Sequence, residues 1–284
     1  MTPKDPNKGD SEVACAKINL ALHVRRRLPN GYHDIETVFA FLDRGDIVSV
    51  QPGEGIRLSI TGPFAEGLSD TDNLVLDAAH LMASKDHSQS GAHIILDKLL
   101  PIASGIGGGS ADAAATLRLL NRFWNIGLSQ SDLMHMSAPL GADVPACILS
   151  QTCRGEGIGQ DLELMKNGSL DGHIALLVNP LVPISTASIF EDWDGVDRGR
   201  LQGSRPLDIA LSGANDLQRS AEWLAPIVSD ILTNLNETDM IIARMSGSGA
   251  TCFALYETEP QAEVACKIIN AAFPDAWTMI GGLK

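Results

Sequence analysis

The chain has 284 residues, of which 44% are hydrophobic, so it is long enough for two domains and can bury a substantial core. Its formal net charge of −14 argues against a nucleic acid polymer as partner, although a small anion can still bind at a local site. No apolar run approaches the roughly 18 residues that span a bilayer, and no signal peptide is visible, so we expect a cytoplasmic protein without a membrane partner. The five cysteines form no C-x-x-C pair, which predicts reduced thiols in the core.

The N-terminal third of the chain begins with a polar segment and continues as a strand. Residues 1–12 are polar and contain prolines, which indicates a disordered lead-in. Residues 13–24 alternate between apolar side chains and a second face that carries Lys17 and Asn19, as expected for a strand. The pattern then predicts a turn at 29–31, strands at 47–51 and 57–61, and a helix at 72–83 capped by Asp72.

The most informative stretch is a glycine-rich loop, in which four glycines fall between residues 105 and 109. A strand-like run at 92–99 precedes it, and a helical pattern capped by Ser110 follows. Because glycine lacks a Cβ, the backbone N–H groups of such a loop can approach a ligand closely. The start of the following helix adds unpaired N–H groups and the positive end of its dipole, which together predict a phosphate site.

Two familiar nucleotide-binding motifs do not fit this loop. A P-loop needs G-x-x-x-x-G-K-[ST], but the chain has no lysine or arginine between Pro101 and Leu117. In a G-x-G-x-x-G frame, the last glycine position is taken by Ser110 or by Asp112. A flexible glycine linker is the alternative, and the flanking strand and helix patterns disfavour it.

The middle of the chain offers a candidate catalytic carboxylate. A second helical pattern at 129–136 leads into 139–145, where Pro139 and Pro145 bracket Asp143 and predict a stiff turn that holds its carboxylate. Residues 154–159 break the regular pattern, so we place a domain boundary shortly afterwards, between 13–164 and 165–284.

The C-terminal part mixes strands and helices without a strict βαβ rhythm, which favours an α+β fold over a doubly wound sheet. Residues 192–205 are polar and predict a loop. The predicted elements are a strand at 173–179, a long helix from near Asn215, strands at 240–245 and 251–256 around a glycine turn at 246–249, a helix with a capping box of Thr258 and Gln261, and a strand at 276–280.

Three segments together resemble the GHMP kinase superfamily: 16–20, the loop at 101–114, and 246–251. The resemblance implies a two-domain GHMP kinase fold of α+β class. In that fold an N-terminal ATP-binding α/β domain and a C-terminal ferredoxin-like domain enclose the active site in the cleft between them. The resemblance also implies ATP and Mg²⁺ as cofactors, with magnesium ligands that the sequence does not identify.

Further segments narrow the resemblance within the superfamily; they are 30–33, 41–43, 141–145 and 155–159. They are similar to members that act in the non-mevalonate route to isoprenoid precursors. This implies that ATP phosphorylates the 2-hydroxyl of a small-molecule substrate, cytidine diphosphate-linked methylerythritol. Two alternatives stay open, namely another small-molecule kinase such as a homoserine or mevalonate kinase, and a non-catalytic ligand-binding member. The sequence leaves monomer and homodimer equally open.

The resemblance also assigns site residues. It implies that Asp143 accepts the proton of the acceptor hydroxyl and that Lys17 pairs with it beside the γ-phosphate. The implied ATP-binding residues are Pro101, Ala103, Ser104, Gly105, Ile106, Gly107, Gly108, Gly109, Ser110 and Ala111. The implied substrate-binding residues are Asn19, Tyr32, His33, Phe39, Thr186 and Phe190. For Phe39, the local pattern alone favours a place in the core.

Overall fold

The computed structural model describes residues 10–85, 91–165 and 170–284, which fold as two compact units. Each unit is assembled from three stretches of chain, whereas the predicted domains are contiguous. The first unit comprises the described residues of Met1–Ala16, Gly45–Ile102 and Gly108–Leu149, and the second comprises Lys17–Arg44, Ala103–Gly107 and Ser150–Lys284.

Two long strands contribute residues to both units. Strand β1 spans Asp10–Arg27 and β2 spans His33–Gly53, joined by the predicted turn. Most of the predicted lead-in lies outside the described residues, but 10–12 already belong to β1. The predicted strand at 47–51 is the end of the 21-residue β2. Both faces of β1 are buried, including the face with Lys17 and Asn19.

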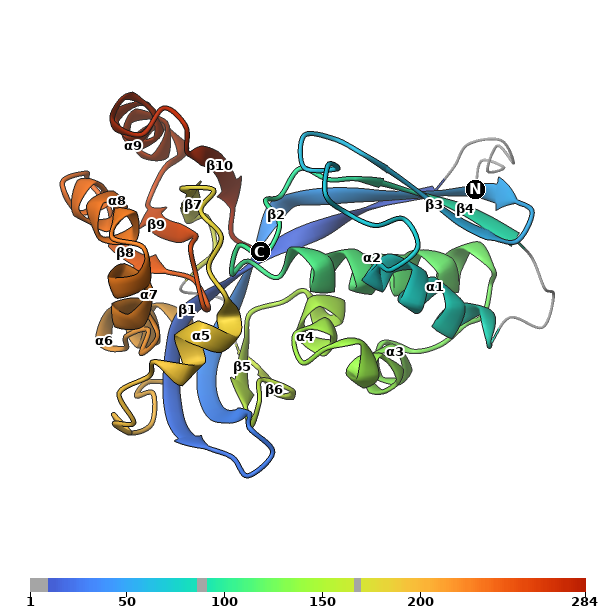
Figure 1. The fold of residues 1–284 in the computed structure, drawn as a ribbon, viewed down its shortest axis with the longest axis horizontal. Coiled ribbons are helices and arrows are strands. Elements are labelled where there is room, and N and C mark those ends of the chain that lie inside the picture. The colour runs from blue at the N-terminus through green and yellow to red at the C-terminus, as the bar shows by residue number, and fades with distance from the viewer. Residues whose placement is uncertain (1–9, 86–90, 166–169) are drawn as a thin grey trace. The chain divides into compact units, whose positions relative to one another are not determined.

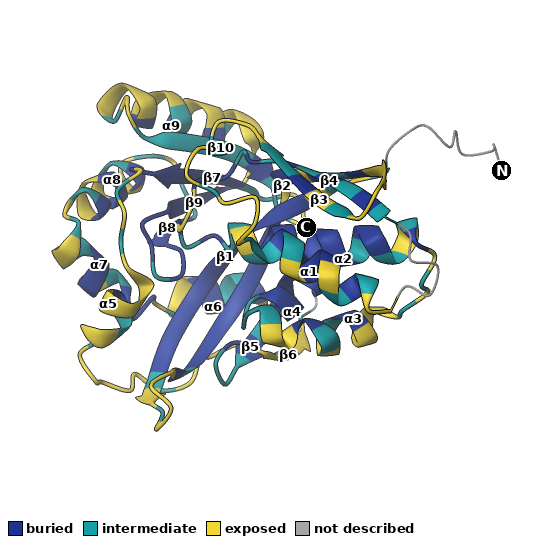
Figure 2. Ribbon diagram, turned by 45° about the vertical axis from the view of Figure 1, so that its right-hand side comes forward, coloured by how far each residue is buried: buried dark blue, intermediate teal, exposed yellow. Residues whose placement is uncertain are grey.

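The first unit is a layer of strands packed against helices. The end of β2 pairs antiparallel with β4 (Gly91–Asp97), and β3 (Ile56–Thr61) runs parallel to β4. The helices are α1 (Leu74–Ala83), α2 (Gly108–Phe123), α3 (Gln130–Ser137) and α4 (Val144–Leu149), with a 3₁₀ turn at Ala138–Leu140. Figure 2 shows α1 with a buried and an exposed face, as an amphipathic helix over a core requires, whereas the middle of α2, residues 111–120, is buried on all sides except at the half-buried Arg118.

Three local predictions for the first unit need correction. The side chain that caps α1 belongs to Asn73, which accepts the N–H of Val75 at 2.9 Å, and not to Asp72. Helix α2 begins at Gly108, so Ser110 lies inside its first turn and is not its N-cap. The predicted turn at Asp143 is present but covers only 142–143, because Pro139 lies in the 3₁₀ turn and Pro145 is already part of α4, where its missing N–H has no cost in the first turn.

The second unit contains a four-stranded antiparallel sheet in the order β10-β7-β9-β8. The strands are β7 (Ile174–Asn179), β8 (Ile242–Met245), β9 (Cys252–Tyr256) and β10 (Trp277–Gly282). The helices are α5 (Thr186–Glu191), α6 (Pro206–Ser212), α7 (Gln218–Leu224), α8 (Ile227–Asn236) and α9 (Glu259–Ala272). Numbered along this unit, the order is 4-1-3-2, which confirms the ferredoxin-like prediction (Figure 1).

Two further predictions fail in this unit. The long helix expected from near Asn215 is two helices, because the residue before Pro226 cannot stay helical: Ala225 has φ −140° and ψ 87°. The break at 154–159 is part of a hairpin of β5 (Cys153–Glu156) and β6 (Asp161–Leu164), in which β5 pairs with β2. The capping box of Thr258 and Gln261 is confirmed at the start of α9.

The five cysteines, all within the described residues, form no disulfide, and four of them are buried, as predicted. Within the described parts of the chain, no helix is long and apolar enough to cross a membrane.

Candidate active site

The glycine loop has a backbone conformation that strongly favours glycine at two positions. Gly105 and Gly107 have φ of +75° and +66°, in the left-handed region. A Cβ on Gly105 would lie 2.5 Å from the carbonyl oxygen of Ser246 and 2.7 Å from that of Gly249. The loop therefore bends tightly and packs backbone against backbone before α2 begins at Gly108.

The first turn of α2 suits an anion. Four N–H groups at the start of any α-helix have no partner within the helix. Gly108 and Gly109 bring no side chain to this turn, and it contains no acidic residue. Gly109 is exposed, so a ligand can reach the turn. The residues present thus fit a bound phosphate, although the helix starts at Gly108, two residues earlier than the sequence predicts.

The predicted C-terminal motif at 246–251 supports the loop. The Ser246 hydroxyl donates to the carbonyl oxygen of Gly105 at 2.9 Å and accepts the N–H of Asn19 at 3.1 Å. The N–H of Thr251 donates to the carbonyl oxygen of Ser104 at 3.2 Å. Residues 103–107 are therefore fixed from two directions, by β1 and by the turn after β8.

Lys17 holds its charge in a buried position beside this loop. Its backbone N–H donates to the carbonyl oxygen of Ile106 at 3.0 Å, and its ammonium donates to Asn19 Oδ1, also at 3.0 Å. The ammonium also lies 5.1 Å from the centre of the Phe39 ring. Only 3% of Lys17 is exposed, so the amide oxygen and the ring replace part of the hydration that burial removes.

Asn19 and Phe39 are arranged around Lys17. The Asn19 amide N–H donates to Thr37 Oγ1 at 2.8 Å, which fixes the amide so that its oxygen faces the ammonium. Phe39 is 1% exposed and offers no free face for a base to stack on, so its place is in the core, as the local pattern favours.

Asp143 lies in the first unit, immediately before α4. Its carbonyl oxygen accepts the N–H of Cys147 at 3.0 Å, which ties its backbone to the helix, and its side chain is half-buried. Lys17 belongs to the second unit. Their joint action is therefore a proposal that rests on the chemistry considered below.

Three aromatic side chains form a cluster in the second unit. The rings of His33 and Phe190 are stacked with centres 5.0 Å apart, and Trp193 meets His33 edge-on at 5.8 Å. Burial, and secondarily the charge of Arg27, lowers the pKa of His33 below its usual value. The imidazole is thus neutral at pH 7 and offers one donor and one acceptor. Tyr32, next to it, is 60% exposed.

The remaining predicted residue, Thr186, is the first residue of α5. Its hydroxyl is 2.9 Å from that of Ser248, which links α5 to the glycine turn after β8. Sequence reasoning missed Trp193 and also Asn215, whose amide donates to the carbonyl oxygens of Met245 and Gly247 at 2.8 Å each. No local pattern distinguishes Asn215 from a helix cap, because its partners lie thirty residues away in the chain.

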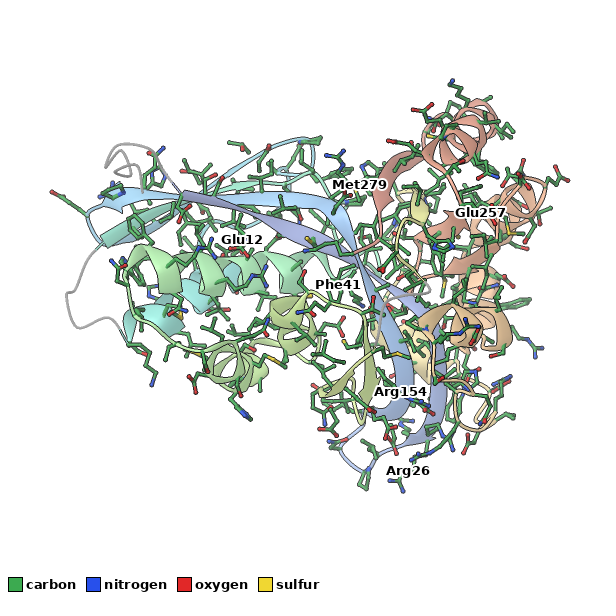
Figure 3. The ribbon with its side chains drawn as sticks, turned by 180° about the vertical axis from the view of Figure 1, so that it is seen from behind. Glu12, Arg26, Phe41, Arg154, Glu257 and Met279 are labelled. Atoms are coloured by element: carbon green, nitrogen blue, oxygen red, sulfur yellow. The ribbon has the colours of Figure 1, made fainter. Side chains whose placement is uncertain are left out.

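The polar segment 192–205 is tied down by charged side chains. Arg154, labelled in Figure 3, donates to the carbonyl oxygen of Leu201 at 2.8 Å and to the Glu36 carboxylate. Glu36 also accepts the N–H of Leu201 at 3.1 Å, and His23 Nδ1 lies 2.8 Å from the carbonyl oxygen of Gly199. The segment that follows the aromatic cluster is therefore held against β1 and β2.

A metal cage is absent from the described residues: none of their histidine, cysteine, aspartate or glutamate side chains form a group of three or more that could hold an ion. Mg²⁺ usually keeps several waters and is held by one or two carboxylates together with substrate phosphates. The donor set therefore fits an ion that is held mainly by a bound nucleotide, and we assign it no ligand.

Comparison with known proteins gives consistent matches along the chain. The family model for the GHMP kinases N terminal domain matches residues 73–151, and the model for GHMP kinases C terminal matches residues 207–275. A 4-diphosphocytidyl-2-C-methyl-D-erythritol kinase from Rhizorhabdus wittichii is 48% identical over 284 residues, covering 99% of this chain and 97% of that protein.

Solved structures show the same relationship. The crystal structure of a 4-(cytidine 5'-diphospho)-2C-methyl-D-erythritol kinase matches with a TM-score of 0.78 and 27% identity, covering 96% of this chain and 100% of that chain. A homoserine kinase from Cytophaga hutchinsonii matches with a TM-score of 0.71 and 16% identity, covering 94% and 95% of the two chains. The second match shows a shared fold alone.

Proposed function

Because this chain belongs to the GHMP kinases, we infer that it catalyses the ATP-dependent phosphorylation of the 2-hydroxyl of 4-diphosphocytidyl-2-C-methyl-D-erythritol. The reaction yields the 2-phosphate and ADP in the non-mevalonate route to isoprenoid precursors. The observation that carries this inference is the near full-length identity to a protein of that name. The ordered glycine loop and the buried Lys17 argue against a member that has lost catalysis.

We propose that the loop and the start of α2 bind the triphosphate of ATP. The residues involved are the predicted ones: Pro101, Ala103, Ser104, Gly105, Ile106, Gly107, Gly108, Gly109, Ser110 and Ala111. Main-chain N–H groups act as the donors here, so Ala111 can take part although its side chain carries no hydroxyl group. Mg²⁺ bound with the nucleotide would neutralise charge on its phosphates.

For the transfer itself, Asp143 and Lys17 have complementary roles. Asp143 accepts the proton of the acceptor hydroxyl, which leaves the oxygen free to attack the γ-phosphorus. Lys17 offsets negative charge on the transferring phosphoryl group and on Asp143. Its fixed ammonium, held by Asn19, needs no reorganisation when that charge develops.

The aromatic cluster is the proposed site for the cytosine. The Phe190 and His33 rings are already stacked on each other, so one planar face of the pair can take the base. The neutral imidazole can read one donor and one acceptor on the base edge. Tyr32 and Thr186 complete the proposed substrate residues together with Asn19.

The test is a substrate panel. Purified protein with ATP and Mg²⁺ is assayed for ADP release with 4-diphosphocytidyl-2-C-methyl-D-erythritol, homoserine and mevalonate. We expect turnover with the cytidine compound alone. Turnover with homoserine or mevalonate would assign another kinase activity, and binding of the cytidine compound without ADP release would indicate a non-catalytic member.

A further inference from the structure

Three ionisable side chains in the first unit meet in its interior, outside the site residues assigned so far. The ammonium of Lys98 lies 2.6 Å from a carboxylate oxygen of Asp46 and 2.7 Å from one of Asp112. The three side chains are between 0 and 4% exposed. Such a group is expensive to bury, so its place in the fold requires a reason.

The group lies at the base of the glycine loop. Lys98 directly follows β4, and Asp112 is one turn into α2, so their contact joins the strand before the loop to the helix after it. The second oxygen of Asp46 accepts the N–H groups of Leu99 and Leu100 at 2.6 and 2.7 Å. These contacts fix the chain on entry to the loop and on exit from it.

Gly108 makes the contact sterically feasible. A Cβ at this position would lie 3.1 Å from Lys98 Nζ, which is tighter than ordinary contact. The close approach of Lys98 therefore favours a small residue at the first position of α2, as the binding of a ligand at this turn would. This connects the buried ionisable side chains to the turn whose N–H groups are proposed to bind the phosphates.

We propose that Asp46, Lys98 and Asp112 form a clamp that closes the base of the glycine loop and aims the first turn of α2 at the phosphates, and that Asp112 takes part as an uncharged acceptor. The three are positioning residues, and the ligand in this proposal is the ATP of the proposed function.

Charge balance supports the uncharged state of Asp112. Asp46 and Lys98 neutralise each other, so a second carboxylate would leave a buried negative charge without a counter-ion. Among the described residues, Asp112 Oδ1 has no hydrogen-bond partner, so no donor there stabilises an anion. Burial raises the pKa of Asp112 to about 8; Lys98 opposes this and Asp46 adds to it. A neutral Asp112 also adds no repulsion beneath a bound triphosphate.

The test compares four variants for ATP binding and for hydrogen exchange of the amides at 99–110. Lys98→Met and Asp112→Leu break the clamp, and Asp112→Asn keeps an uncharged acceptor. Thr116→Ala is the control, because Thr116 is a buried α2 residue whose hydroxyl donates within its own helix, to the carbonyl oxygen of Asp112. Exchange is measured without nucleotide, so it tests the clamp even if the chain proved to act on another substrate.

We expect Lys98→Met and Asp112→Leu to speed exchange at 99–110 and to weaken ATP binding about tenfold or more, the usual effect of losing support for a positioned site. In Asp112→Asn, both the exchange rates and the ATP affinity should stay within about twofold of the unmodified protein, because asparagine keeps an uncharged acceptor. The KM for the cytidine substrate should stay nearly constant in every variant. If Lys98→Met does not fold, the test rests on the comparison of Asp112→Leu with Asp112→Asn.

A pH series separates positioning from mere stability. ATP affinity of the unmodified protein should fall between pH 7 and pH 9, as Asp112 ionises, and that of Asp112→Asn should not. The charged groups that act on Asp112 in the described structure are Lys98 and Asp46, and both are kept in this variant. Unchanged exchange and affinity in Asp112→Leu, or weak binding in Asp112→Asn at pH 7, would overturn the clamp while leaving the kinase activity intact.

Discussion

At the scale of single residues, the proposed catalytic pair differs in how each member is held. Lys17 is immobilised on a buried strand by Asn19 and by the ring of Phe39, whereas Asp143 is half-buried and its carbonyl oxygen accepts the N–H of Cys147 in α4. This division suits phosphoryl transfer, because the cation must be preorganised and the proton acceptor must remain accessible to the substrate hydroxyl.

Asp143→Asn should lower kcat by about 10² to 10⁴, the usual contribution of a positioned general base. The KM for ATP should change little, because the amide keeps the size of the side chain and the phosphates are bound by the loop. Steady-state kinetics with both substrates varied will measure this. A variant that turns over as fast as the unmodified protein would remove Asp143 from the mechanism.

Phe190→Ala should raise the KM for the cytidine substrate about tenfold or more, because a base–aromatic stack contributes roughly 1–3 kcal/mol. The KM for ATP should not change. Phe190→Tyr, which keeps an aromatic face, should stay close to the unmodified protein. An equal rise in both KM values would argue that Phe190 serves the fold and does not contact the base.

At the scale of elements, the glycine loop combines a strained backbone with a close contact, and these can be separated by substitution. Gly105→Ala introduces a Cβ that meets the carbonyl oxygens of Ser246 and Gly249. Gly127→Ala is a matched control, since Gly127 has a similar φ of +79° but open space around its Cβ position. In both variants, alanine in the left-handed region should lower the free energy of unfolding by about 1–2 kcal/mol.

Only Gly105→Ala should weaken ATP binding, by about tenfold or more, because a shifted backbone misdirects the donors of the loop. Calorimetric titration with ATP and chemical denaturation of both variants provide the two measurements. If Gly127→Ala weakened ATP binding equally, the cause would be strain in general and not the packing of the loop on the glycine turn.

The sequence predicts helices and strands well where a local pattern determines them, and less well where contacts with residues distant in the chain determine where they begin and end. Alternation predicts β1, and the capping box of Thr258 and Gln261 marks the start of α9. The predicted continuous helix near Asn215 was wrong, because Pro226 outweighs the apolar periodicity. Helix α2 begins before Ser110, at Gly108, and Lys98, which follows β4, holds its first turns through Asp112.

The candidate site shows the same limit. The residue pattern and the resemblance predict the glycine loop, Lys17 and Asp143 as site residues, but neither indicates the aromatic ring of Trp193 or the buried ionisable side chains next to α2. A pattern of single residues carries no signal for Asp46, Lys98 and Asp112, since Lys98 lies 52 positions from Asp46 and 14 positions from Asp112 in the chain. Such long-range contacts become visible only in the folded structure.

At the scale of the whole molecule, the buried Asp112 should leave a signature in the dependence of stability on pH. Its pKa is raised from 3.8 to about 8, so the folded state binds this proton more tightly than the unfolded state does. Its contribution to the free energy of unfolding should therefore fall as pH rises from about 4 to about 8. Denaturant unfolding at pH 5 and pH 8 should show a smaller decline in Asp112→Asn than in the unmodified protein. Equal declines would mean that Asp112 is ionised throughout.

Because Trp193 meets His33 edge-on, its fluorescence should report on ligand binding at the aromatic cluster. An indole next to an imidazole changes its emission when a further ring enters the stack, so occupancy by a cytidine compound can be followed by fluorescence without a label. Because the triphosphate is expected at a separate group of residues, ATP should leave this signal nearly constant. The two ligands could then be titrated independently in one cuvette, and the order in which they arrive could be timed.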